Sequence, residues 1–147
     1  MIFETHAHYD DEAFDPDRDA LLRSMHENGI ETIVNVGASL RGVEDTVKLM
    51  KQYPFVYGAI GVHADEVGTL DEEKMELLCK YCRLPKTVAV GEIGLDYYWD
   101  KENHETQKKW FVRQMDLAKE TELPIIVHSR DAAKDTLDIM KAERADC

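Results

Sequence analysis

Short apolar segments alternate along this chain with longer segments of helical character, and the alternation repeats five times. The apolar segments are rich in β-branched and aromatic residues and predict strands at residues 2–6, 32–36, 55–60, 87–90 and 124–127. Helices are predicted after them at residues 16–28, 40–52, 71–82, 105–120 and 132–141. Strict alternation of this kind predicts an α/β fold with a parallel sheet and right-handed crossovers.

Two architectures fit this alternation, an open doubly wound sheet and a TIM (β/α)8 barrel. Ionisable residues follow four of the predicted strands: His6 and His8, then His63, Glu92 and His128. In a barrel these strand ends converge on one mouth, whereas the first and fifth strands of an open sheet lie too far apart to share a site. We therefore favour a barrel. Eight β/α pairs need about 200–250 residues, so this chain of 147 residues is predicted to be one domain, residues 1–147, truncated after about five of the eight pairs.

Composition limits the classes of function. The net charge of −12 argues against binding nucleic acid through a broad basic surface, although bound cations can supply positive charge locally. No apolar run is long enough to cross a membrane, and the first residues lack the pattern of a signal peptide. Three cysteines give no even disulfide framework, and Cys79 and Cys82 are predicted to lie on a buried helix face. These features predict a cytoplasmic protein.

His6 and His8 form the strongest local motif. In an extended segment, residues i and i+2 point to the same face, so both imidazoles can reach one metal ion at about 2.0–2.1 Å. The alternative is a pair of histidines with ordinary hydrogen bonds at the end of a strand.

Glu92 follows a wholly apolar strand, so its carboxylate is expected to be largely dehydrated. A buried carboxylate must be protonated, paired or bound to a metal. A glutamate can also bridge two cations about 3.5–4 Å apart, as two-metal hydrolases require. The alternative is an ion pair with Arg130.

His128 follows the fifth predicted strand, and its neutral imidazole suits a divalent transition metal. A lone histidine at a strand end is more often structural, but the agreement of three strand ends favours a metal site. Arg130 offers a planar fork for phosphate or carboxylate. His63 is a candidate for contact with substrate. Tyr97 and the two aromatic residues after it either stack on nucleobases or pack against the protein.

Four motifs in this order resemble the TatD family of metal-dependent deoxyribonucleases, which belongs to the amidohydrolase-like barrel hydrolases. They are residues 3–8 (FETHAH), 61–63 (GVH), 91–97 (GEIGLDY) and 124–130 (PIIVHSR). The resemblance implies two divalent metal ions, magnesium or else manganese or zinc. His6 and His8 would bind one ion, His128 the other, and Glu92 would bridge them as the catalytic carboxylate. It also implies hydrolysis of DNA phosphodiesters, often from the 3' end of a single strand.

The sequence departs from the family pattern in three respects. Glu4 stands where the family usually has Asp, and Asp65 where many members have His. The family's remaining ligands, a His on the sixth strand and an Asp on the eighth, fall beyond residue 147, so no general base can be assigned. Two alternatives therefore stay open: a hydrolase of C–N bonds from the same superfamily, and an inactive fragment that binds a metal or a partner. Unpaired strand edges also predict self-association.

Overall fold

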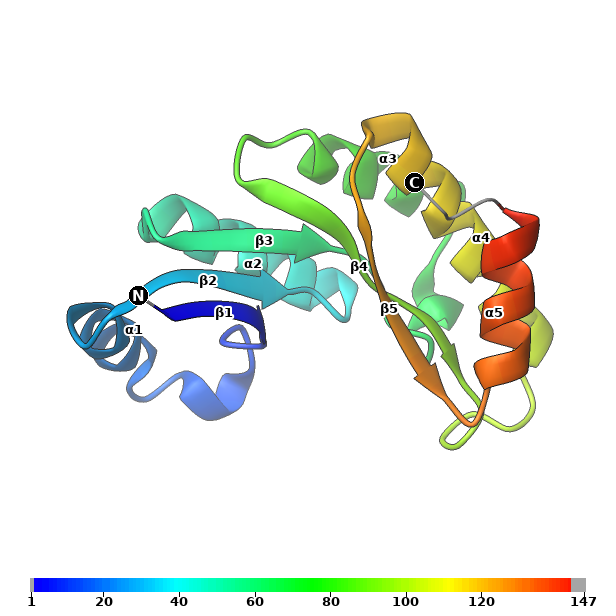
Figure 1. Cartoon of the computed structure of the whole chain (residues 1–147), viewed down its shortest axis with the longest axis horizontal. Helices are drawn as coiled ribbons and strands as arrows, with labels where there is room; N and C mark the ends of the chain where they lie inside the picture. The colour runs from blue at the N-terminus through cyan, green and yellow to red at the C-terminus, as the bar shows by residue number, and fades with distance from the viewer. Residues whose placement is uncertain (1, 144–147) are drawn as a thin grey trace.

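The computed structural model describes residues 2–143 and contains all the predicted strands and helices (Figure 1). The strands are Ile2–Ala7 (β1), Ile30–Val36 (β2), Val56–Ile60 (β3), Thr87–Asp96 (β4) and Ile125–Arg130 (β5). The α-helices are Arg18–Glu27 (α1), Leu40–Gln52 (α2), Glu72–Cys82 (α3), His104–Thr121 (α4) and Ala133–Ala142 (α5). Two short 3-10 helices, Glu12–Phe14 (η1) and Val67–Thr69 (η2), lie in the connections.

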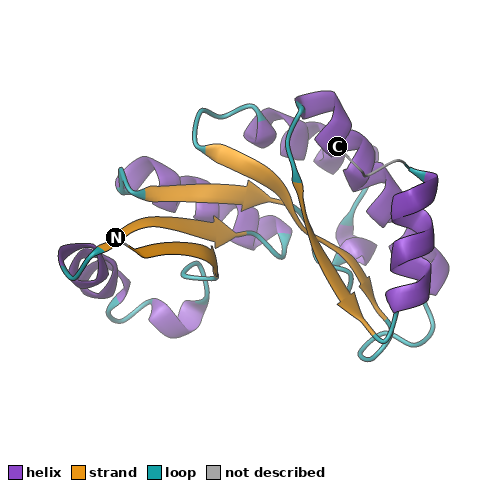
Figure 2. Ribbon diagram, viewed as in Figure 1, coloured by secondary structure: helices purple, strands orange, loops and turns teal. Residues whose placement is uncertain are grey.

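The strands form one parallel sheet in the order β1-β2-β3-β4-β5. A doubly wound sheet reverses its strand order at a switch point, whereas here every strand pairs with the next one along the chain. The sheet twists strongly from β1 to β5, and α2 lies behind β2 and β3 (Figure 2). The barrel prediction is therefore confirmed, because the five β/α units form a half-barrel.

Local sequence signals account for the helix ends. Ser39 caps α2 by accepting a hydrogen bond from the amide of Gly42, and Asp71 caps α3 by accepting one from the amide of Lys74. Gly29, with φ of +95°, follows α1 in the left-handed region that stops a helix. The predicted start of α1 at residue 16 was two residues early, because residues 15–17 form turns before Arg18.

The main core lies between the sheet and the helices that cover it. Its largest fully buried side chains include Ile60 on β3, Met75 on α3 and Phe111 on α4. Cys82 is buried in this core and Cys79 packs against it, which confirms that the C-x-x-C motif belongs to a packed helix face.

The predicted end of the fourth strand at residue 90 was wrong. β4 continues to Asp96 and pairs with β5 along this extension, with Gly94 opposite His128 and Asp96 opposite Arg130. Gly91 and Gly94 lower the strand propensity of this extension, so the sequence did not predict a strand there. Both glycines are needed by the packing, because a Cβ atom on either would overlap β5. As a result, Glu92 and His128 lie within strands and not after them.

Candidate metal centre

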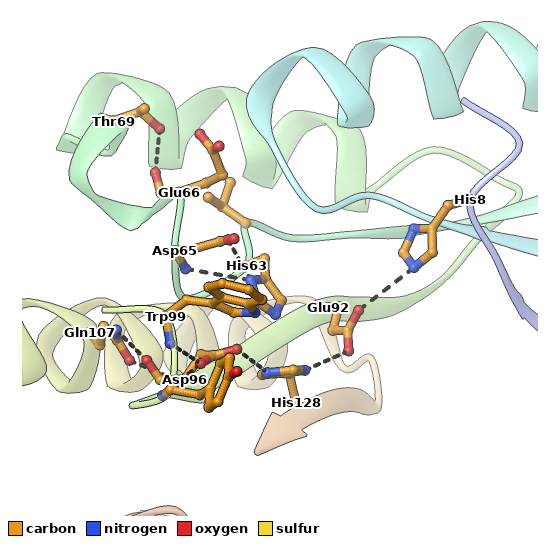
Figure 3. A network of polar contacts seen from close by, with 12 residues as sticks. His8, His63, Asp65, Glu66, Thr69, Glu92, Asp96, Trp99, Gln107 and His128 are labelled. Carbon is orange, nitrogen blue, oxygen red and sulfur yellow. Dashed lines mark hydrogen bonds and ion pairs between the residues drawn. The ribbon is translucent and has the colours of Figure 1, made fainter. Parts of the chain in front are cut away.

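Side chains from three strands meet around the carboxylate of Glu92. Its Oε2 atom lies 3.4 Å from Nε2 of His6 and 3.8 Å from Nε2 of His8, which come from the end of β1. Its Oε1 atom lies 3.3 Å from Nδ1 of His128 on β5. Figure 3 shows the carboxylate between His8 and His128, one oxygen toward each.

Two groups among the described residues have ligand atoms close enough to hold a metal ion. The first contains His6, His8 and Glu92, and the second contains His63, Glu92 and His128; within each group the ligand atoms all lie within 4.8 Å of one another. Glu92 belongs to both. A carboxylate shared by two ligand groups has the arrangement that a bridging ligand requires.

Among residues 2–143, no lysine or arginine lies close enough to balance the charge of Glu92. Its side chain is 15% exposed, and its only ion-pair partners within residues 2–143 are histidines. The alternative pairing with Arg130 is wrong, because that guanidinium lies against two aromatic rings. A poorly solvated carboxylate facing several imidazole nitrogens needs a cation or protonated histidines. This set of donors fits a divalent metal ion.

Neighbouring groups fix which ring nitrogen of two histidines, His8 and His128, is available. Nδ1 of His8 lies 2.8 Å from the carbonyl oxygen of Val36, which can only accept, so this nitrogen carries the proton and Nε2 keeps its lone pair. Nε2 of His128 lies 3.0 Å from Oδ2 of Asp96, which leaves Nδ1 to face Glu92. Partners of this kind orient metal-binding histidines and select their tautomer.

Asp96 was not recognised as a site residue from the sequence, although it lies in one of the motifs. It ends β4 and is 1% exposed. Its Oδ1 atom accepts hydrogen bonds of 3.0 Å from the amides of Tyr98 and Trp99, while Gln107 binds its backbone amide and carbonyl groups, each at 2.9 Å. Burial raises the pKa of Asp96, but the Trp99 amide, His128 and the Tyr98 amide outweigh burial and hold the pKa below its ordinary value. The signal available in the sequence was its place in the GEIGLDY motif at residues 91–97.

His63, predicted to contact substrate, lies in the loop after β3 with its ring centroid 4.2 Å from that of His128. Its Nδ1 atom contacts the carboxylate of Asp65, the residue that departs from the family pattern. The structure therefore makes His63 a candidate metal ligand as well as a candidate substrate contact.

A cavity of about 570 Å³ opens beside these groups, and acidic residues dominate its wall. The acidic lining residues besides Glu92 are Asp10, Asp11, Glu12, Asp45, Asp65 and Glu66. Apart from histidines, the one described basic residue among the lining is Arg41. Burial raises the pKa of Asp10, against the hydrogen bond that it accepts from Asn35. Such a cavity attracts cations and repels a polyanion unless its charge is neutralised.

Tyr97 and Arg130, both predicted to bind substrate, do not line this cavity. The hydroxyl of Tyr97 donates a hydrogen bond of 2.8 Å to the carboxylate of Asp135. Its ring stacks on the ring of His104, with the two centroids 3.6 Å apart. Tyr97 therefore packs against α4 and α5, away from Glu92, because the strand it follows turns its side chain toward the helices. Arg130 places its guanidinium carbon 4.0 Å from the centroid of the Tyr98 ring.

The five strands form half of a parallel barrel, and a cluster of histidines and a carboxylate gathers at β1, β4 and β5. This combination is typical of metal-binding barrel proteins, whose functional groups lie at the carboxyl ends of the strands. A family profile described as TatD related DNase matches residues 3–147. The chain belongs to this family.

Individual relatives agree with this assignment. The chain is 38% identical over 146 residues to the uncharacterized metal-dependent hydrolase YabD of Bacillus subtilis, covering 99% of this chain and 57% of YabD. It is 30% identical over 119 residues to the 3'-5' ssDNA/RNA exonuclease TatD of Escherichia fergusonii, covering 81% of this chain and 46% of that protein. The crystal structure of the TatD homologue YjjV from Escherichia coli superposes with a TM-score of 0.89 at 29% identity, covering 99% of this chain and 57% of YjjV. The chain thus spans about half the length of these relatives.

Proposed function

We propose that the full-length protein is a two-metal phosphodiesterase that removes nucleotides from the 3' end of single-stranded DNA. The observation that carries the proposal is the position of Glu92, whose two oxygens face two different groups of histidines. Such a shared carboxylate suits a pair of cations that act on one phosphodiester. The name of the Escherichia fergusonii relative, an ssDNA/RNA exonuclease, supports the choice of substrate.

The ligands divide between two cation positions. His6 and His8 would hold one ion with Glu92, and His128 would hold the other with Glu92 and His63. Bound divalent ions polarise a phosphodiester and lower the pKa of a bound water molecule. Imidazole ligands favour manganese or zinc over magnesium, which prefers oxygen ligands.

The remaining residues prepare the site for these ions. The carbonyl of Val36 holds the proton on Nδ1 of His8, and the carboxylate of Asp96 holds the proton on Nε2 of His128. The other ring nitrogen of each histidine therefore keeps its lone pair for a metal ion. The acidic cavity disfavours a phosphodiester until cations neutralise it, which makes substrate binding depend on metal.

A nuclease assay on the full-length protein tests this proposal. Single-stranded DNA labelled at its 5' end should shorten stepwise with manganese and remain intact with EDTA, and a strand blocked at its 3' end should resist cleavage. A Glu92→Gln variant keeps the size of the side chain but removes its charge, and it should be inactive. Hydrolysis of cyclic amides without cleavage of DNA would instead identify a C–N hydrolase.

A further inference from the structure

We propose that Tyr98, Trp99 and Arg130 form a binding site for one nucleotide of an unpaired strand, with the base stacked on Trp99 and the phosphate bound by Arg130. This inference rests on the proposed function for the identity of the polymer. It adds a contact outside the candidate metal centre, on a surface that the ligand groups do not use. We call these three residues the aromatic patch.

The rings of the aromatic patch are accessible. Trp99 is 67% exposed and Tyr98 is 45% exposed, whereas Trp110 is buried in the core. The two exposed rings meet edge to face, with centroids 4.7 Å apart and planes at 89°. Large aromatic side chains carry much apolar area, so a pair left in water offers a surface for a flat ligand.

Arg130 supplies a cation beside the rings. Its guanidinium carbon lies 4.0 Å from the centroid of Tyr98 and 5.5 Å from that of Trp99. No carboxylate lies within ion-pair distance of Arg130 across residues 2–143, although acidic residues outnumber basic ones by 30 to 18 in the whole chain. Its fork of donors therefore remains available to a phosphate group. Aromatic rings with an arginine match the stacking and charge of a single-stranded nucleotide.

Asp96 fixes the aromatic patch relative to the candidate metal centre. Its Oδ1 atom accepts hydrogen bonds from the amides of Tyr98 and Trp99. Figure 3 shows Asp96 between Trp99 and His128, and its Oδ2 atom contacts the His128 ring. β-Sheet pairing places Arg130 directly opposite Asp96. A nucleotide on the patch is thus bound to the same rigid unit that carries a candidate metal ligand. The interior bases of duplex DNA are stacked on one another and cannot present a free face to Trp99.

Fluorescence on the full-length protein tests the aromatic patch directly. The probe is an oligothymidylate of about eight nucleotides with phosphorothioate linkages that resist hydrolysis. It is titrated into the protein once in the presence of manganese and once in the presence of EDTA. The contribution of Trp99 is the difference between the emission of the protein and of its Trp99→Phe variant. This contribution should be quenched on binding. Trp99→Ala should weaken binding by about 5- to 100-fold, whereas Trp99→Phe, which keeps a ring, should lose much less.

Arg130→Ala should weaken binding and reduce the slope of log affinity against log salt by about 0.7, the contribution of one phosphate contact on a single strand. Arg83→Ala is the matched control, because Arg83 is an exposed arginine that precedes β4 and so lies at the opposite end of the sheet. Unchanged Trp99 emission in both titrations, or equal affinity of Trp99→Ala and the unaltered protein, would overturn the inference. If the unaltered protein cleaves DNA and Trp99→Ala binds the probe as tightly as the unaltered protein, the aromatic patch alone is rejected. If the probe quenches Trp99 but the protein does not cleave unmodified DNA, the proposed activity alone is rejected.

Discussion

The Nε2 atom of His128 lies 3.0 Å from the Oδ2 atom of Asp96, a carboxylate that is almost completely buried. The other ring nitrogen of His128 faces Glu92. The imidazole is therefore held between two carboxylates, one on the candidate metal centre and one behind it. This arrangement explains why a motif that contains Glu92 also contains an acid four residues later.

The first prediction concerns Asp96. Asp96→Asn should lower the affinity for manganese by about 10- to 100-fold, because the neutral amide no longer fixes the tautomer of His128 or makes it more basic. Calorimetric titration of the full-length protein measures this change. Asp138→Asn is the control, since Asp138 is an exposed acid on α5 that pairs with Lys134. Equal manganese affinities for the two variants would show that Asp96 does not support the metal site.

The second prediction concerns Gly94, which has a φ of +142° and lies where a Cβ atom would overlap the carbonyl group of His128. Gly94→Ala should lower the free energy of unfolding by about 2–5 kcal/mol, from backbone strain and displacement of β5. Gly68→Ala should change it by less than about 1 kcal/mol, because no atom lies within 4 Å of a Cβ there. Urea unfolding of both variants measures the difference. A Gly94→Ala protein as stable as Gly68→Ala would contradict the close packing of β4 on β5.

Periodicity was sufficient to predict the order of strands and helices in this chain. Apolar runs and helix caps such as Asp71 are local signals, and all the predicted strands and helices are present. The position of polar residues after successive strands then favoured the barrel, and the sequential strand order confirms it. The end of β4 could not be predicted, because Gly91 and Gly94 are tolerated in a strand only where the neighbouring strand packs closely against them.

The candidate site was predicted in part. Spacing brought attention to His6, His8, Glu92 and His128, and the structure brings these residues together. The direction of Tyr97 could not be inferred, because it depends on Asp135, 38 residues further along the chain. The role of Asp96 was missed for a similar reason, since its partner His128 is separated from it by 32 residues.

The third prediction concerns Tyr97. Burial, and then the hydrogen bond to Asp135, raise the pKa of Tyr97 to about 12. Tyr97→Phe should therefore lower the free energy of unfolding by about 1–2 kcal/mol near neutral pH and leave the affinity for oligothymidylate unchanged. A raised pKa contributes stability that is complete below the unfolded value of about 10 and is lost as the pH rises toward 12. The stability difference between the two proteins should thus shrink over that interval. A loss of oligothymidylate affinity without a loss of stability would restore Tyr97 as a substrate contact.

The fourth prediction concerns residues 1–147 produced alone. β1 and β5 form the two edges of the sheet, and exposed Ile2 and Phe3 lie on β1. Unpaired edges with apolar side chains are templates for pairing with other chains, so this segment should self-associate and show little nuclease activity. Size-exclusion chromatography with light scattering, followed by the nuclease assay with manganese, tests both points. A stable monomer that cleaves DNA as fast as the full-length protein would contradict both points, because five β/α units would then be sufficient for a stable fold and for activity.

The fifth prediction concerns the shared position of Glu92 in the two ligand groups, because this is the central claim about the site. Glu92→Ala removes a ligand from both groups together with the charge between them, whereas His63→Ala removes a ligand from one. The full-length protein should therefore bind two manganese ions, His63→Ala should keep one of the two sites intact, and Glu92→Ala should lose affinity at both.

Calorimetric titration of these three proteins with manganese is the most direct measurement, with circular dichroism to confirm that each variant is folded. The account predicts that Glu92→Ala loses more manganese affinity than His63→Ala, because a bridging carboxylate contributes charge to both cations. Equal affinities for Glu92→Ala and His63→Ala would contradict the assignment of Glu92 as the bridging ligand.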